Sequence, residues 1–246
     1  MGEVFAVLSG KGGTGKTSVC AGVAAALAAG GRKVLCIDCD VGLRNLDISL
    51  GMSDSGSLSF LDVCAGGYDL SAASRHPQYN SLRFLTAPMN CPVEKIDPKP
   101  FGEMLRKARE EYEYIFLDAP AGVDAGFRLV TAYADRILVV TGPGPAAVRD
   151  AARVGDLLEI GGKQEAKLIV NRVSRSMLST VRMTVDDVMD AAGLPLIGVV
   201  LEDPSITLSA AFGKSIHQYA RHSDAARAFT RIAARIQGFH QPITLR

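Results

Sequence analysis

Eight residues near the start of the chain have the types and spacing of a phosphate-binding loop, G-K-G-G-T-G-K-T from Gly10 to Thr17. Glycines let backbone N–H groups turn inward, and a helix that follows adds partial positive charge where phosphates would lie. Lys16 would reach the phosphates and the Thr17 hydroxyl would bind Mg²⁺. The residues that we expect to contact a nucleoside triphosphate are Gly10, Lys11, Gly12, Gly13, Thr14, Gly15, Lys16, Thr17 and Ser18.

The surroundings of this loop match those of a P-loop. An apolar run, Val4–Leu8, precedes it, and an alanine-rich helical pattern, Ser18–Ala29, follows it. The pattern is short, and a random chain of this length would show it about one time in a hundred. A strand before it and a helix after it make the alternative, a glycine-rich surface turn, the weaker interpretation.

Three aspartates stand where phosphoryl transfer needs carboxylates. Asp118 ends the apolar strand Tyr114–Leu117, and Asp38 and Asp40 follow the strand Val34–Ile37. Residues two apart in an extended segment point the same way, so Asp38 and Asp40 are both predicted to face the phosphates. Such residues place Mg²⁺ and orient water. The alternative is that they only cap strand ends and begin turns.

Apolar runs alternate with helical patterns along the chain, with no internal repeat. Near-continuous apolar strands are buried on both faces, so we expect a single-domain α/β fold with a doubly wound, mostly parallel sheet flanked by helices. The remaining strands are expected at Leu82–Thr86, Ile137–Thr141, Leu168–Val170 and Ile197–Leu201. The remaining helices are expected at Phe101–Glu110, Val123–Tyr133, Ala146–Ile160, Thr184–Ala191, Ile206–Phe212 and Ser223–Gln237. The segment Asp54–Pro100 is the least regular and is expected to face a partner.

Composition narrows the classes of function. With 246 residues and 48% hydrophobic content the chain can bury a large core. A formal charge of +1 gives no large basic field, so nucleic-acid binding is not expected. Five cysteines and no signal peptide indicate a reducing, cytoplasmic setting, and no apolar run is long enough to span a membrane.

Two minor motifs are not expected to do chemistry. Cys36 and Cys39 form a C-x-x-C at a strand end, where three residues span about 10 Å, which is too far for a disulfide. Small buried apolar cysteines are the better interpretation. Gly2 suggests myristoylation, but the sixth residue is Ala6 rather than Ser or Thr.

These motifs together resemble the MinD/ParA group of ATPases. Lys11–Thr17 is similar to the group's deviant Walker A motif, which carries an extra lysine near its start. Ile37–Asp47, with the sequence I-D-C-D-V-G-L-R-N-L-D, resembles the MinD branch in particular, and Asp118–Gly122 is similar to its D-[SA]-P-A-G segment. The resemblance covers residues 1–238, leaving 239–246 as a short tail.

The resemblance implies a role for each matching residue. Lys16 would hold the β- and γ-phosphates of ATP or ADP, and Lys11 would reach the partner's nucleotide across a homodimer. Asp40 would orient the attacking water, and Asp118 with Thr17 and Asp38 would hold Mg²⁺. The residues implied around the adenine are Asn171, Arg172, Glu202, Asp203 and Pro204.

The resemblance also implies an ATP-driven switch that positions the division septum. Its dimer would bind a division inhibitor and an activator and contact the inner face of the membrane. Surfaces implied for regulators are Arg44, Asn45 and Asp47, and a helix carrying Val148, Arg149 and Asp150. Two alternatives remain open: a ParA-like partition or cargo-positioning ATPase that uses DNA, and a MinD paralogue without membrane docking.

The tail differs from the MinD pattern. The final segment Gly238–Arg246 has one basic residue, and Pro242 interrupts a helix, whereas MinD proteins end in a basic amphipathic segment. The preceding helix alternates apolar and arginine residues, which is typical of a last helix packed on a sheet. Membrane contact through the tail is therefore expected to be weak.

Overall fold

A single eight-stranded sheet organises the computed structural model, which describes residues 1–53, 57–89, 91–163, 165–174 and 184–243. The strands lie in the order β3-β4-β2-β5-β1-β6-β7-β8, and every neighbouring pair is parallel except β3 with β4. Their bounds are β1 Glu3–Leu8, β2 Val34–Asp38, β3 Ser74–Arg75, β4 Leu82–Leu85, β5 Tyr114–Asp118, β6 Arg136–Thr141, β7 Ala166–Val173 and β8 Leu196–Leu201.

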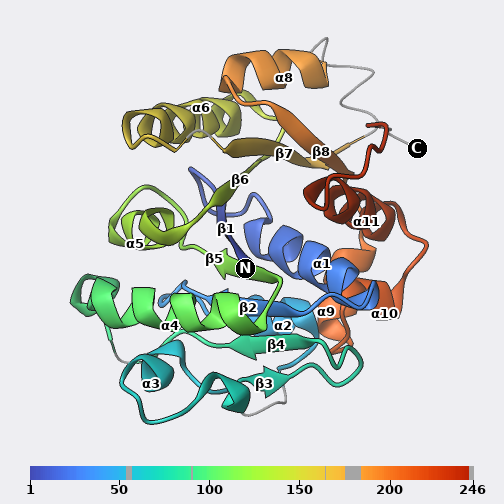
Figure 1. Ribbon diagram of the computed structural model, residues 1–246. Coiled ribbons are helices and arrows are strands. Elements are labelled where there is room, and N and C mark those ends of the chain that lie inside the picture. Colours follow the sequence, from blue (N-terminus) through green and yellow to red (C-terminus); the bar gives the residue numbers. More distant parts are fainter. Residues whose placement is uncertain (54–56, 90, 164, 175–183, 244–246) are drawn as a thin grey trace.

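Helices cover both faces of this sheet (Figure 1). One face carries α4 (Pro98–Glu111), α5 (Ala125–Tyr133) and α6 (Pro145–Ile160), with α3 (Phe60–Cys64) against α4 and α8 (Val185–Ala192) against α6. The other face carries α1, α2, α9, α10 and α11. Their bounds are α1 Lys16–Ala29, α2 Leu46–Leu50, α9 Ser205–Ala211, α10 Ile216–Tyr219 and α11 Asp224–Ile236.

Two hydrophobic cores result, one on each side of the sheet. Because side chains alternate along a strand, β5 sends Phe116 to the α1 side and Leu117 to the α4 side, and both are fully buried. Phe116 stacks on Phe5 of β1 with ring centroids 5.2 Å apart. Apolar strands without polar alternation thus produce the doubly wound α/β fold that the sequence predicts.

The strand order fixes the place of the chemistry. From β1 the chain crosses to β2, which lies beyond β5 on one side of β1. β6 lies directly on the other side of β1. Ligands in open α/β sheets bind beyond the carboxyl ends of the strands at such a switch point. The loop that follows β1 lies there, with the ends of β2 and β5 beside it.

The segment between residues 54 and 100 is more regular than its composition indicates. Its described parts form α3, the short 3-10 turns Leu70–Ala72 and Val93–Lys95, β3 and β4. The helix after it also begins earlier than the predicted Phe101, because Asp97 caps Lys99 N–H and Pro98 occupies the first turn. Cys36 and Cys39 are buried and free, as expected.

Candidate nucleotide-binding site

The P-loop curls as its glycines predict. Gly13 and Gly15 both have φ of 83°, a left-handed conformation that other residues rarely adopt. α1 begins directly at Lys16, so its free N–H groups face the loop. A Cβ on Gly15 would lie 2.3 Å from Nδ2 of Asn171, so only glycine fits there.

The ammonium of Lys16 lies against a buried carboxylate at the end of β5. Its Nζ donates to Oδ1 of Asp118 at 2.8 Å, and both side chains are almost closed to solvent. Burial alone would lower the pKa of Lys16, but the charge and hydrogen bond of Asp118 outweigh it and raise that pKa above its ordinary value. Lys16 is therefore a cation in the protein. Thr17 also contacts Asp118 through a side-chain hydrogen bond.

Asp38 is fully buried at the end of β2. Its two oxygens accept hydrogen bonds from N–H of Asp40 at 2.9 Å and of Leu46 at 3.1 Å. Burial and the nearby charge of Asp118 raise the pKa of Asp38 to about 7, despite these two hydrogen bonds. Asp38 thus connects the phosphate side of the sheet to the first turn of α2.

Asp40 and Lys11 lie on the open side of the site. Oδ1 of Asp40 accepts from N–H of Gly42 and Leu43, both at 3.2 Å, and its side chain is partly exposed. Asp38 and Asp40 thus accept hydrogen bonds from different parts of the loop, and the charge of Asp40 still acts on Lys16. Lys11 is exposed, and its ammonium has no hydrogen bond or ion pair among the described residues.

A pocket of about 410 Å³ opens beside the P-loop between the ends of β7 and β8. Asn171 at its base is almost fully buried and donates from Nδ2 to the Thr14 carbonyl at 2.8 Å. Within the described residues, Oδ1 of Asn171 and Oγ1 of Thr14 are buried without a partner. Buried polar atoms are normally paired, so these two indicate a site for a polar ligand.

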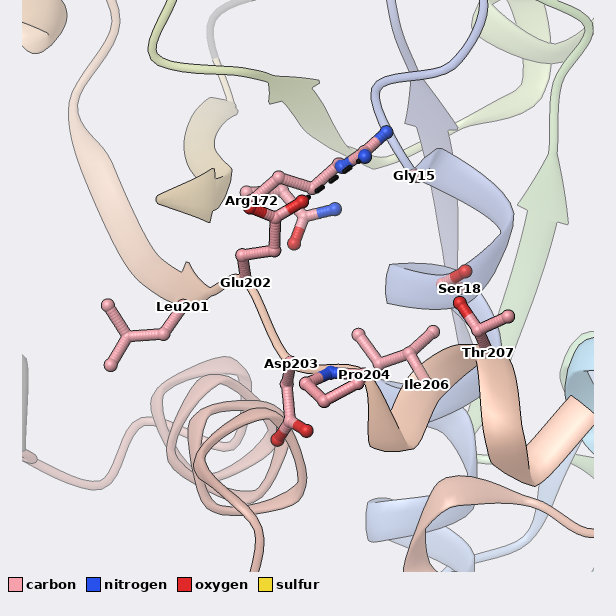
Figure 2. A pocket seen from close by; sticks show the side chains of 10 residues that line it. Gly15, Ser18, Arg172, Leu201, Glu202, Asp203, Pro204, Ile206 and Thr207 are labelled. Carbon is pink, nitrogen blue, oxygen red and sulfur yellow. Dashed lines mark hydrogen bonds and ion pairs between the residues drawn. The ribbon is translucent and has the colours of Figure 1, made fainter. Parts of the chain in front are cut away.

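Arg172 and Glu202 border this pocket on the side of the P-loop (Figure 2). Arg172 has a φ of 59°, and its guanidinium donates to the Gly13 carbonyl at 3.1 Å and to Glu202 at 3.3 Å. Both side chains are more than half exposed, so this ion pair contributes little to stability. Through its two hydrogen bonds, Arg172 connects the P-loop to Glu202 at the end of β8.

Asp203 lies at the rim, but its carboxylate points away from the pocket (Figure 2). It accepts from N–H of Ser205 at 2.9 Å and of Ala225 at 3.0 Å. Partial burial would raise its pKa, yet these hydrogen bonds lower it below the ordinary value. Asp203 thus stabilises the starts of α9 and α11, while Pro204 lines the pocket.

The sequence did not predict three of the residues that line the pocket. Leu201, Ile206 and Thr207 line the same pocket as Asn171, together with Gly15 and Ser18 of α1. The only signal for Ile206 and Thr207 was their place directly after Pro204, at the start of a predicted helix.

The donor atoms present fit Mg²⁺ bound together with phosphate. No group of three or more His, Cys, Asp or Glu side chains arranged for a metal occurs in the part of the chain that the structure describes. Mg²⁺ usually keeps several waters and takes one or two protein oxygens plus substrate phosphates. Thr17 and Asp118 offer such oxygens side by side.

The predicted regulator surfaces differ in exposure. Val148 of α6 faces the core and is buried. Its side chain therefore cannot contribute to a surface, contrary to the prediction. The backbone of Asp150 packs against Gly10, where a Cβ would lie 2.6 Å from the Asp150 carbonyl oxygen. Arg44 reaches Oγ1 of Thr86 at 3.1 Å, while Leu43 beside it is 70% exposed.

The described part of the tail folds back on the body of the protein. Arg235 of α11 donates to the carbonyls of Gln241 at 3.0 Å and Pro242 at 2.7 Å, and also to Ile197 of β8. Among the described helices, none has both the length and the apolar composition to cross a bilayer. Residues 244–246 lie outside the described residues.

Comparison with known proteins agrees with this geometry. A family described as the CobQ/CobB/MinD/ParA nucleotide binding domain matches residues 5–216. The septum site-determining protein MinD of Synechocystis is 37% identical over 97% of this chain and 90% of its own. A MinC:MinD cell division protein complex of Aquifex aeolicus superposes with a TM-score of 0.90 at 34% identity, covering 98% of both chains. MinD of Pyrococcus horikoshii, complexed with Mg-ADP, gives 0.83 at 30% identity over 96% of both.

The sheet order, the P-loop and the polar pocket beside it define a P-loop nucleotide-binding protein. Identity to the curated MinD proteins extends over nearly the whole chain at a level that a shared fold alone does not require. The chain belongs to the MinD group of the CobQ/CobB/MinD/ParA nucleotide-binding family.

Proposed function

We propose that the chain is a Mg²⁺-dependent ATPase switch that dimerises with ATP and positions the cell-division septum through Min-type partners. The observation that carries this proposal is the cationic Lys16 held at 2.8 Å from Asp118 in a P-loop beside a pocket lined by Asn171, whose Oδ1 has no partner among the described residues. Its MinD relatives are named septum site-determining proteins, which supports the cellular role.

Each residue has a task in this mechanism. Lys16 leaves Asp118 to bind the β- and γ-phosphates, and the N–H groups at the start of α1 add positive charge. Thr17 and Asp118 would hold Mg²⁺, which neutralises charge on the phosphates when bound. Asp40, fixed by N–H of Gly42 and Leu43, orients the attacking water. Asn171 uses its free Oδ1 to accept from the adenine amino group.

Lys11 makes the switch depend on a second copy. Its ammonium is exposed and unpaired among the described side chains, which suits a contact with phosphates bound to another subunit. Hydrolysis and phosphate loss remove the negative charge that joins two such lysines, so the dimer separates. A MinC:MinD complex among the structural relatives supports a division inhibitor as one partner, and an activator would be a second.

Phosphate release from Mg-ATP tests the enzymatic part of this proposal. We expect slow turnover by the full chain and a loss of at least about a hundredfold in Lys16→Ala, because a phosphate-binding cation is removed. Lys107→Ala, an exposed lysine on α4, is the matched control and should keep the activity of the parent. Equal turnover in all three proteins would contradict the assignment of the P-loop as the active site.

A further inference from the structure

The loop between β2 and α2 carries Asp40, the residue to which the proposed ATPase assigns the attacking water. Oδ1 of Asp40 accepts from N–H of Gly42 and Leu43, and its carbonyl accepts from N–H of Arg44 at 3.1 Å. The charge of Asp40 acts on Lys16, so the carboxylate lies near the phosphate site. All these hydrogen bonds are local, and Gly42 and Leu43 are exposed. A loop of this kind needs an attachment to the body of the protein to keep its carboxylate in place.

Arg44 provides such an attachment. Its φ of 50° lies in the left-handed region, which residues other than glycine adopt only at a cost. Nε and Nη2 of its guanidinium both donate to Oγ1 of Thr86, at 3.3 and 3.1 Å. Two donors of one planar group on the same oxygen fix the direction of the side chain as well as its position. An unfavourable backbone conformation that is held by a specific contact indicates a functional constraint.

Thr86 is a rigid acceptor. It follows Leu85, the last residue of β4, and β4 pairs in parallel with β2 so that Leu85 lies opposite Ile37 (Figure 1). Thr86 is 4% exposed, and its backbone N–H and C=O pair with Leu58 and Phe60 at 2.9 and 3.0 Å. Its hydroxyl is therefore fixed to the sheet, beside the strand that leads into the loop.

The contact with Thr86 also keeps a cation away from the carboxylate. Arg44 lies four residues after Asp40 and three before Asp47, yet it forms an ion pair with neither among the described residues. A neutral hydroxyl holds the guanidinium instead. A guanidinium paired with Asp40 would occupy the oxygens that a water needs, because such pairs are frequently bidentate.

We propose that Thr86 is a positioning residue for ATP hydrolysis: through Arg44, its hydroxyl holds the loop so that the carboxylate of Asp40 stays open to the attacking water. This inference rests on the proposed ATPase function. Neither Thr86 nor Arg44 lines the pocket beside the P-loop. Their contact should therefore affect the rate of hydrolysis and leave the affinity for ATP unchanged.

The kcat and the ATP affinity of Thr86→Val test the proposal. Valine has nearly the shape of threonine but lacks the acceptor oxygen, so kcat of the full chain with Mg-ATP should fall roughly tenfold or more, while the Kd for ATP stays within about twofold. Thr86→Ser keeps the oxygen and should retain kcat within about twofold of the parent. Thr131→Val is the matched control, because this buried hydroxyl donates to the Phe127 carbonyl within α5, and it should turn over like the parent.

A double-mutant cycle then shows whether Thr86 acts through Arg44. Asparagine at position 44 tolerates the left-handed backbone but is too short to reach Thr86. Thr86→Val/Arg44→Asn should therefore lose no more kcat than Arg44→Asn alone, since both changes remove the same contact. Multiplied losses in the double variant would show that the two residues act independently and would overturn the proposal.

Three further outcomes would overturn it. Thr86→Val with the kcat of the parent would leave the hydroxyl without a role in hydrolysis. A loss in Thr86→Ser as large as in Thr86→Val would assign the effect to packing. A rise in the Kd for ATP that matches the loss of turnover would assign it to the nucleotide pocket. Each of these outcomes leaves the difference between the parent and Lys16→Ala intact, whereas equal turnover of those two proteins would overturn the proposed ATPase itself.

Discussion

Lys16 and Asp118 form an ion pair that is almost closed to water. Removing two charges from solvent is costly, and such a pair is often no more stable than apolar side chains of similar size. In the proposed mechanism, this ion pair would exchange its partners. A bound phosphate would give Lys16 a second anion, and Asp118 would then be available for Mg²⁺.

Gly15→Ala tests the close approach at the pocket. Its φ of 83° and the 2.3 Å approach to Asn171 leave no room for a methyl group. We expect a loss of about 1–3 kcal/mol in the free energy of unfolding and a weaker nucleotide affinity. Gly144→Ala is the control, because nothing lies within 4 Å of its Cβ and no positive φ is required. Equal affinities measured by calorimetry would contradict this packing.

Asp38→Asn tests the buried carboxylate. Its pKa of about 7 lies above the ordinary 3.8, so its stabilising contribution is complete below about pH 4 and is lost as the pH rises through about 7. Without nucleotide or Mg²⁺, the parent should lose about 4 kcal/mol from this group between about pH 4 and pH 8. Denaturant unfolding of Asp38→Asn should show a smaller loss over that range. Parallel pH profiles for the two proteins would count against a raised pKa.

The short helix α2 beside the site is held at both ends by buried side chains. His76 is fully buried, its Nε2 lies 2.9 Å from the Leu50 carbonyl at the end of α2, and its Nδ1 accepts from N–H of Gln78 and Tyr79 at 3.1 Å. This arrangement requires a neutral ring that donates from Nε2. Because α2 begins at the N–H that Asp38 accepts, His76 and Asp38 fix its two ends.

Protonation of His76 should loosen this anchor. Burial lowers its pKa below 6.5, despite the hydrogen bond to Leu50, so its contribution to stability is present above pH 6.5 and is lost as the pH falls through its lowered pKa. We expect His76→Ala to lower the unfolding free energy at neutral pH by about 1–3 kcal/mol and to reduce the further loss on acidification. His222→Ala, an exposed histidine, should retain the pH profile of the parent. An unchanged acid profile in His76→Ala would contradict the assigned tautomer.

The sequence predicted the continuous apolar strands well, but not the elements that depend on contacts with distant residues. β1, β2 and β5 are continuous apolar runs that can only be buried strands, and the P-loop pattern places β1 before α1. In contrast, α2 has five residues, too few for a helical period, and depends on the side chain of Asp38. The two residues of β3 form a strand only because β4 lies beside them.

The candidate site shows the same contrast between features that the sequence predicted and features that it did not. Glycine spacing and strand-end aspartates predicted that Lys16 and Asp118 belong to one phosphate site, because parallel strands bring their carboxyl ends together, but the direct contact between these two side chains was not predicted. The direction of an individual side chain was not predictable. Asp203 turns to the N–H of Ala225, a residue 22 positions later, and this contact depends on how α11 packs on β8.

At the scale of the whole molecule, the proposed ATP-dependent dimer would make the chain one half of an assembly. The P-loop, Lys11 and the rim formed by Arg172 and Glu202 all lie beyond the carboxyl ends of the strands. A second copy that faces this edge could offer its own Lys11 to the bound nucleotide. In this proposed dimer, ATP would act as the bridge between two surfaces that would otherwise repel each other.

Mass measurement in solution with Mg-ATP tests this central claim most directly. In an Asp40→Ala background, which blocks hydrolysis, the chain should form dimers with ATP and remain monomeric with ADP. Adding Lys11→Ala should return it to monomers, whereas adding Lys107→Ala on α4 should not. Dimers of equal abundance in Asp40→Ala and Lys11→Ala/Asp40→Ala would show that no lysine acts across the interface and would contradict the account.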